Sequence, residues 1–215
     1  MREENVIRYY LLCNRLKNVI RTGWLDWNVN KDRLESVAEH IFGVQMLAIA
    51  MKSEYNYDVD IMKVIMMLAV HELEEIIIGD LTLFDKDIDD KKEIGHKAID
   101  KVLSGLVDKD KIRSLILEFD ERKTNEAKFA YYCDKLECDL QAKIYDEENC
   151  VNLLDQYNNK SMDDNEVRLL LNSGMSWGEM WLVFGQKRYN YDDNFLSVSN
   201  YVKDNKIKKL IKEMD

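Results

Sequence analysis

The sequence predicts an all-α protein, and both its composition and its patterning favour this class. The 215 residues include no proline and only 8 glycines, whereas a β-sandwich or barrel of this length would need more turn residues of both kinds. Apolar residues recur at helical spacing through most of the chain, and no alternating stretch is long enough to predict a strand. With 46% hydrophobic and 33% charged residues, the composition is that of a folded globular protein. We therefore expect a single helical domain over residues 1–215.

The first half of the chain predicts three helices. Helical spacing extends over about residues 3–20 and stops near Gly23, where glycine interrupts the pattern. Ser36 and Glu39 have the spacing of a reciprocal N-terminal cap, so a second helix is expected to begin there. Residues 59–78 are almost entirely apolar except for a polar end, which predicts a buried central helix that Gly79 terminates.

The second half predicts several more helices. A charged loop at residues 85–92 leads to amphipathic helices at about 92–106 and 110–119. Thr124 or Asn125 is expected to cap a long helix that ends near residue 146. The rest of the chain predicts about three helices, whose many aromatic residues favour a core or a dimer interface.

Net charge restricts the classes of partner. The chain carries 31 Lys and Arg against 41 Asp and Glu, a formal net charge of -10. This field repels polyanions, so nucleic acid is excluded as a general partner. A small phosphorylated substrate stays compatible, because a bound divalent cation reverses the local sign of the potential.

The cysteines and the N-terminus predict a cytoplasmic protein. Cys13, Cys133, Cys138 and Cys150 show no CxxC spacing, as expected of free thiols in a reducing compartment. The first ten residues are charged where a signal peptide would be apolar, and no uncharged run of about 18 residues occurs. We expect neither export nor a membrane span.

Two of the three histidines lie beside carboxylates in segments that are expected to be buried. On a helix, Glu75 lies four residues after His71 and shares its face, whereas Glu72 is adjacent and rotated by about 100°. Imidazole nitrogens and carboxylate oxygens suit Zn, Mn, Fe, Co or Ni. A buried histidine beside glutamates is also a common hydrogen-bonded structural group. The additional presence of His40, Asp80 and Asp134 favours a metal site.

Four motifs follow one another along residues 8–146, about two thirds of the chain. They are Arg21-Thr-Gly-Trp24, Glu35-Ser-Val-Ala-Glu-His40, His71-Glu-Leu-Glu-Glu75 with Gly79-Asp80, and Glu126-Ala-Lys-Phe with Asp134-Lys-Leu-Glu137. On these residues the sequence resembles the HD phosphohydrolase superfamily, and specifically its 5'-deoxynucleotidase branch. The resemblance implies a helical bundle with residues 1–146 as the recognisable core and 147–215 as a helical extension of the same domain.

The resemblance also implies one divalent metal ion, which His40, His71, Glu72 and Asp134 would bind. Its identity among Mn, Co, Zn, Fe, Ni and Mg is left open. His96 does not complete a second metal site and is expected to be an exposed surface residue.

The remaining motif residues match catalytic and substrate-binding positions of the family. Glu75 and Asp80 correspond to its catalytic carboxylates, with the acid and base roles exchangeable. Arg21 would hold the substrate phosphate, Asp80 would also contact substrate, and Trp24 would help to select the sugar. Arg21 as a solvated helix end and Trp24 as a cover of the core are the alternative interpretations.

We therefore expect a metal-dependent phosphohydrolase that converts deoxynucleoside 5'-monophosphates to nucleoside and phosphate. One residue departs from the family pattern, because Glu72 occupies the position of the aspartate in the His-Asp pair. The alternatives are a catalytically weakened protein that binds or senses a nucleotide, and a hydrolase of nucleoside triphosphates, cyclic nucleotides or guanosine alarmones. An all-α interaction module without a site is a further alternative. Dimerisation is expected from the resemblance and the aromatic content.

Overall fold

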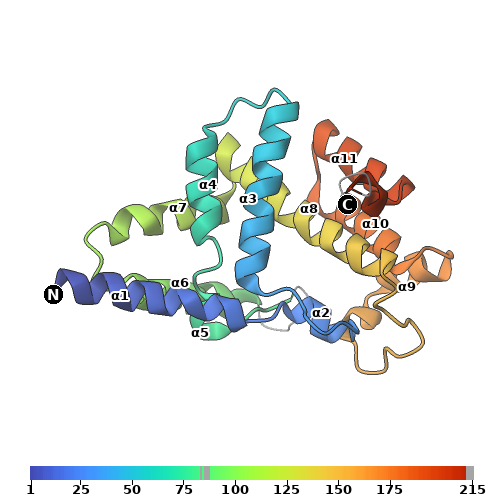
Figure 1. Cartoon of the computed structure of the whole chain (residues 1–215), viewed down its shortest axis with the longest axis horizontal. Helices are drawn as coiled ribbons and strands as arrows, with labels where there is room; N and C mark the ends of the chain where they lie inside the picture. Colours follow the sequence, from blue (N-terminus) through green and yellow to red (C-terminus); the bar gives the residue numbers. More distant parts are fainter. Residues whose placement is uncertain (83, 85–87, 212–215) are drawn as a thin grey trace. The chain divides into compact units, whose positions relative to one another are not determined.

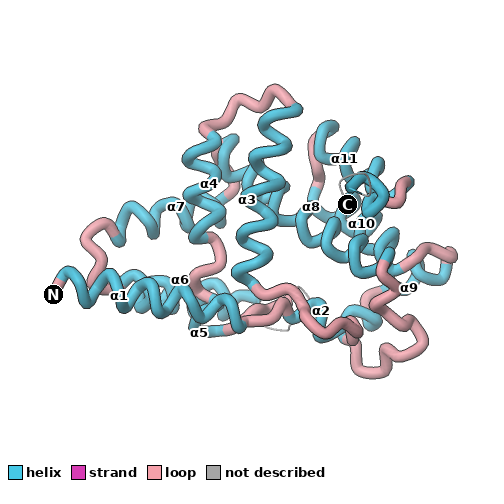
Figure 2. Tube along the Cα trace, in the orientation of Figure 1, coloured by secondary structure: helices cyan, strands magenta, loops and turns pink. Residues whose placement is uncertain are grey.

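The computed structural model describes residues 1–82, 84 and 88–211, and it confirms the all-α class (Figures 1 and 2). Within these residues every element of regular secondary structure is a helix, and the only β-type pairing is an isolated antiparallel bridge between Ile20 and Ser36. Residues 85–87 of the expected loop at 85–92 lie outside the described residues, and the rest of this prediction was wrong, because α6 already begins at Ile88. None of the helices in the described ranges is long and apolar enough to cross a membrane.

The chain forms two compact units, and each combines two separate segments. The first unit contains Met1–Thr22 and Glu35–Tyr131, and the second contains Gly23–Leu34 and Tyr132–Asp215. Because the segments alternate along the sequence, the units are not successive N- and C-terminal domains. The organisation of residues 1–215 as one domain stays a prediction.

The first unit is a set of helices packed around an apolar core. In it α3 packs on α4, α4 on α7, and α6 on both α5 and α7. Val37, Val70, Leu73, Val102 and Ile116 are among its buried residues. Its elements are α1 (Arg2–Cys13), η1 (Asn14–Asn18), α3 (Val37–Glu54), α4 (Ile61–Val70), α5 (Glu75–Ile78), α6 (Ile88–Leu103), α7 (Lys109–Glu121) and the first turns of α8 (Asn125–Glu147).

Two of the expected helices are shorter or interrupted. The helix expected over 3–20 is α-helical only to Cys13, continues as the tighter η1, and ends because Val19 is extended and accepts a hydrogen bond from the Val37 N–H at 2.8 Å. The helix expected over 59–78 is interrupted by a turn between α4 and α5. There the His71 Nδ1 lies 2.7 Å from the Leu68 carbonyl oxygen, which in an uninterrupted α-helix would accept the N–H of Glu72.

The second unit is built around aromatic residues. Trp24 lies on α2 (Thr22–Asp26), and its ring contacts Tyr145 at 5.3 Å and Trp177 at 6.2 Å between centroids. The C-terminal aromatics Trp177 and Phe195 are buried, so they form a core, and a role in a dimer interface stays a prediction. The other helices are η2 (Lys160–Asp163), α9 (Asn165–Asn172), α10 (Trp177–Tyr189), α11 (Asp193–Asp204) and η3 (Ile207–Ile211), with α10 packed on α9 and α11.

Close packing of α10 on α8 predicts a strong effect of one methyl group. A Cβ atom added at Gly178 would lie 2.8 Å from Asp146 Cβ and 3.1 Å from the backbone Cα of Lys143. We expect Gly178→Ala to lower the free energy of unfolding by about 1–3 kcal/mol, measured by denaturant titration. Gly95→Ala is the control, because its nearest neighbour would be 3.7 Å away and helical alanine is favoured over glycine by up to about 1 kcal/mol. Equal stability changes in both variants would contradict this interpretation.

Candidate metal centre

His40 is placed by the N-terminal cap of α3. The predicted reciprocal cap is confirmed, because the Ser36 Oγ accepts a hydrogen bond from the Glu39 N–H at 3.4 Å while the Glu39 carboxylate accepts one from the Ser36 N–H at 2.9 Å. His40 follows in the next turn and is fully buried. A cap of this kind fixes where the helix begins, and so it fixes the position of His40 along α3.

His71 and Glu72 lie in the turn that follows α4. The His71 side chain is buried, and its Nδ1 lies 2.7 Å from the Leu68 carbonyl oxygen. Since a carbonyl oxygen only accepts hydrogen bonds, Nδ1 must carry the proton. A neutral ring in this tautomer presents the lone pair of Nε2. Histidines that bind a metal through one ring nitrogen usually donate the N–H of the other nitrogen in a hydrogen bond of this kind.

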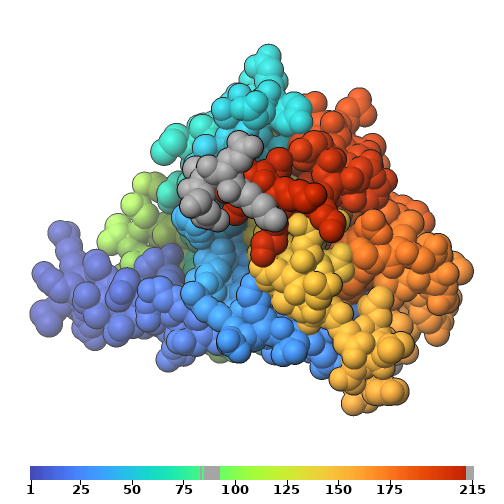
Figure 3. Space-filling model, turned by 45° about the vertical axis from the view of Figure 1, so that its right-hand side comes forward, coloured from blue at the N-terminus to red at the C-terminus, as the bar shows by residue number. Residues whose placement is uncertain are grey.

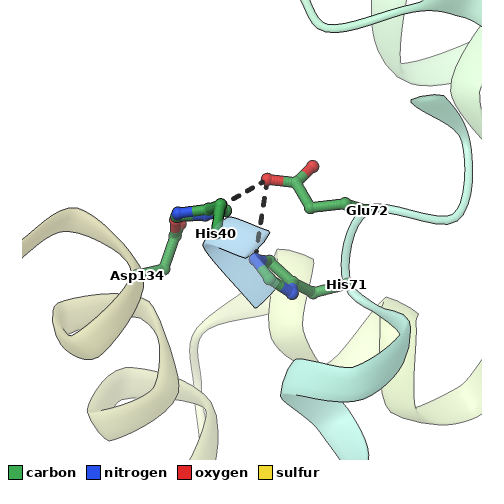
Figure 4. A group of neighbouring side chains, drawn as sticks. All are labelled: His40, His71, Glu72 and Asp134. Carbon is green, nitrogen blue, oxygen red and sulfur yellow. Dashed lines mark ion pairs between the residues drawn. The ribbon is translucent and has the colours of Figure 1, made fainter. Parts of the chain in front are cut away.

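The structure brings His40, His71 and Glu72 together (Figure 4). The Glu72 Oε1 atom lies 3.5 Å from His71 Nε2 and 3.9 Å from His40 Nε2. One ligand atom from each of the three residues lies within 4.8 Å of the others. Two imidazole nitrogens and a carboxylate oxygen are a donor set for divalent transition metals. The side chains of this cluster therefore fit the metal that the sequence predicts.

Asp134, drawn as the fourth side chain in Figure 4, belongs to the part of α8 in the second unit. It is 2% exposed, and its Oδ2 lies 2.8 Å from the Lys135 ammonium. A carboxylate buried to this degree requires a charged or hydrogen-bonding partner, which Lys135 provides at one oxygen. Its assignment as a metal ligand remains a prediction.

Arg21 is held beside the metal cluster by the chain that precedes α3. The bridge between Ile20 and Ser36 continues with a hydrogen bond from the Arg21 N–H to the Glu35 carbonyl oxygen at 3.1 Å. The Arg21 Nη1 atom lies 3.5 Å from Glu72 Oε1 and 3.7 Å from Asp80 Oδ1. A guanidinium group is planar, and its fork of N–H donors matches the oxygen atoms of a phosphate.

Asp80 follows α5 through a turn that requires glycine. Gly79 has φ 75° and ψ 168°, a backbone region that is essentially restricted to glycine. Thr22 then holds Asp80 twice, because its N–H donates to the Asp80 carboxylate and its hydroxyl donates to the Asp80 carbonyl oxygen at 2.8 Å. Thr22 was not among the candidate residues, although it lies inside the first motif beside Arg21.

Glu75 is a buried carboxyl beside the carboxylates of Glu72 and Asp80. Burial raises the pKa of Glu75 well above its usual range, the negative charges of Glu72 and Asp80 raise this pKa further, and the Arg21 guanidinium partly opposes the shift. Glu75 is only 7% exposed. A carboxyl that retains its proton in this way can act as a proton donor.

Trp24 and His96 are the two other residues whose roles the sequence analysis considered. Trp24 belongs to the second unit, where it is buried against Tyr145, so its predicted role in sugar selection stays a prediction. His96, on α6, forms an ion pair with Asp120 on α7 at 2.9 Å and has a side chain that is 25% exposed. His96 is therefore only partly exposed and paired, rather than the exposed surface residue that was expected, and its exclusion from the metal site stays a prediction.

An all-α fold with a buried cluster of two histidines and a carboxylate is the architecture that the HD resemblance implies. The family model described as HD domain matches residues 13–169, and the chain therefore belongs to the HD domain family. The 5'-deoxynucleotidase HDDC2 of Dictyostelium discoideum is 34% identical over 153 residues, which cover 67% of this chain and 79% of that protein. Human 5'-deoxynucleotidase HDDC2 is 29% identical over 147 residues, 66% of this chain and 69% of that protein.

Two solved structures share this fold. The PH0347 protein of Pyrococcus horikoshii OT3 matches with a TM-score of 0.68 and 26% identity, over 92% of this chain and 98% of that one. A protein from Magnetospirillum magnetotacticum MS-1, described as a predicted metal-dependent phosphohydrolase, matches with a TM-score of 0.63 and 20% identity, over 97% and 94% of the two chains. At that identity the second match supports the fold alone.

Proposed function

We propose that this protein is a metal-dependent 5'-deoxynucleotidase, which hydrolyses deoxynucleoside 5'-monophosphates to nucleoside and inorganic phosphate. The observation that carries the proposal is the convergence of His40, His71 and Glu72 beside the guanidinium of Arg21. This arrangement offers a cation site and an anion-binding side chain within one small region. The names of the HDDC2 relatives support the same reaction for this chain.

The divalent metal would be held by His40, His71, Glu72 and Asp134. When bound, it supplies Lewis acidity toward the phosphoryl group and toward the attacking water. The first three residues have the donor atoms and spacing for this role. Asp134 enters the set through the family motif and as a buried carboxylate.

Phosphate binding, proton transfer and orientation of the reacting groups are assigned to side chains of the protein. Arg21 binds the phosphate through N–H groups that its contacts with Glu72 and Asp80 orient. Glu75 donates a proton to the 5' oxygen of the departing nucleoside, for which its raised pKa suits it. Asp80, fixed by Thr22, orients the water or the leaving group, and Trp24 contributes to the choice of sugar.

Phosphate release from a panel of nucleotides tests the proposal. The panel contains ribo- and deoxynucleoside monophosphates and triphosphates, each assayed with Mn, Co, Zn, Fe, Ni or Mg and with a chelator. We expect release only from the deoxynucleoside monophosphates, and complete loss of release after metal removal. Release that persists in chelator would contradict the metal mechanism, and release confined to triphosphates would assign a different substrate.

The nucleotide-sensing alternative depends on Glu72, and the geometry allows a direct test. Its carboxylate already reaches toward both imidazoles, at 3.5 and 3.9 Å, and also contacts Arg21 at 3.5 Å. In Glu72→Asp the carboxylate loses one methylene of reach. A displacement near 1 Å costs about a hundredfold in rate, so we expect kcat/KM to fall by about that factor. A large gain in hydrolysis would instead show that glutamate weakens the native site, as the sensing alternative requires.

A further inference from the structure

The last turn of α7 is tied to two other helices of the first unit by consecutive ion pairs. The Glu118 carboxylate lies 2.7 Å from the ammonium of Lys63 on α4. The Asp120 carboxylate lies 2.9 Å from Nε2 of His96 on α6. Residues two positions apart on a helix point in nearly opposite directions, so the two pairs hold α7 from opposite sides. Phe119 lies between them in sequence.

Phe119 contacts a proposed metal ligand. It is 9% exposed, and its ring lies 5.1 Å from the His71 imidazole between centroids, at an angle of 61°. The Leu68 carbonyl oxygen fixes Nδ1 of the same imidazole. The hydrogen bond alone leaves the ring free to tilt about that contact, whereas an aromatic neighbour at an edge-on angle limits the tilt. Together the two contacts set the direction of Nε2.

We propose that Asp120 and His96 are positioning residues that hold Phe119 against His71 and thereby orient the Nε2 lone pair toward the metal. This inference rests on the proposed metal site. Among the described residues, neither His96 nor Asp120 belongs to a group of possible metal ligands, so their effect would reach the site through the aromatic ring. Partners that orient a ligand directly change metal affinity by about 10–100-fold, and a partner one step further away should change it less.

A second ion pair between the same two helices provides a matched control. Arg113 on α7 lies 2.7 Å from the carboxylate of Asp100 on α6. It is six residues before Phe119, about 9 Å along the helix axis at 1.5 Å per residue. Removing this pair weakens the contact between α6 and α7 in the same chemical way, but leaves the neighbours of His71 unchanged.

The test compares Asp120→Asn with Asp100→Asn in the otherwise intact protein. Each metal-free variant is titrated with Mn²⁺ by calorimetry, and its thermal midpoint is measured without metal. We expect similar small decreases in the midpoint, but a several-fold weaker Mn²⁺ affinity for Asp120→Asn only. Equal affinities in the two variants would overturn the proposal, because the Asp120 pair would then be a purely structural contact.

Phe119→Leu identifies the route of the effect. In that background, adding Asp120→Asn should cause no further loss of Mn²⁺ affinity, since the ring that transmits the effect is already absent. Additive losses would overturn the proposed route through Phe119. The wild-type protein is titrated first with Mn²⁺ and assayed for phosphate release, so failure of the proposed metal site is recognised separately as absence of wild-type binding.

Discussion

His71→Asn is expected to abolish metal binding and to reduce hydrolysis of deoxynucleoside monophosphates by at least about a thousandfold. The asparagine amide can still donate to the Leu68 carbonyl oxygen, which His71 Nδ1 contacts at 2.7 Å, while the ligand atom Nε2 is removed. Metal ions supply several kcal/mol of transition-state stabilisation, and each 1.36 kcal/mol corresponds to a factor of ten in rate. The loss should therefore affect chemistry far more than folding.

The measurement combines phosphate release at saturating Mn²⁺ with calorimetric titration of the metal. His40→Asn should give the same result, because His40 Nε2 approaches the same Glu72 oxygen at 3.9 Å. His96→Gln is the histidine control, for which the proposed positioning role allows only a several-fold change. If His71→Asn retained the Mn²⁺ affinity and turnover of the wild type, the cluster would be structural and the proposed mechanism would be wrong.

Local signals in the sequence were sufficient to predict the surroundings of His40. Ser36 and Glu39 have the residue types and spacing of a capping box, and the structure contains both hydrogen bonds. The sequence likewise predicted that a helix ends at Gly79, and in the structure this glycine follows α5 with a positive φ of 75°. Such features depend on residues within one or two turns of each other, so the amino-acid order alone determines them.

Long-range contacts were beyond this kind of prediction. The apolar run at 59–78 indicated one helix, but the His71 side chain competes for the Leu68 carbonyl oxygen and the helix ends. Thr22 was not recognised as the residue that fixes Asp80, because 58 positions separate them in sequence. The same holds for Phe119 and His71, whose contact forms only when α7 packs on α4.

Glu75→Gln is expected to lower kcat by about 10²–10⁴-fold, the usual contribution of a general acid or base. The amide has nearly the same shape but cannot deliver a proton to the leaving oxygen. Glu74→Gln is the matched control, because it makes the same change in the neighbouring residue. The Glu74 side chain faces α6, since a Cβ atom added at Gly95 would lie 3.8 Å from Glu74 Cβ and 3.7 Å from Glu74 Cγ. Equal rates for wild type and Glu75→Gln, with metal still bound, would exclude the proposed role.

The pH dependence distinguishes the acid role of Glu75 from the base role. Because burial and the charges of Glu72 and Asp80 raise its pKa, a donor role requires kcat/KM to fall as pH rises through this raised pKa. Glu75→Gln should lack that decline. A rise of kcat/KM over the same range in the wild type, lost in the variant, would assign the base role instead.

Glu75→Gln should change stability and activity in opposite directions, because it is expected to lower activity but to raise the free energy of unfolding. A carboxyl with a raised pKa in the folded protein contributes stability that is complete below the unfolded-state pKa and is lost as pH rises through the folded-state pKa. The metal-free wild type should therefore lose stability over this interval, whereas Glu75→Gln should not. Denaturant titration of both metal-free proteins across the interval measures the difference, and parallel stability curves would show that Glu75 titrates as it does in the unfolded chain. A variant that is more stable but much less active would identify Glu75 as a group whose burial serves catalysis at the expense of folding.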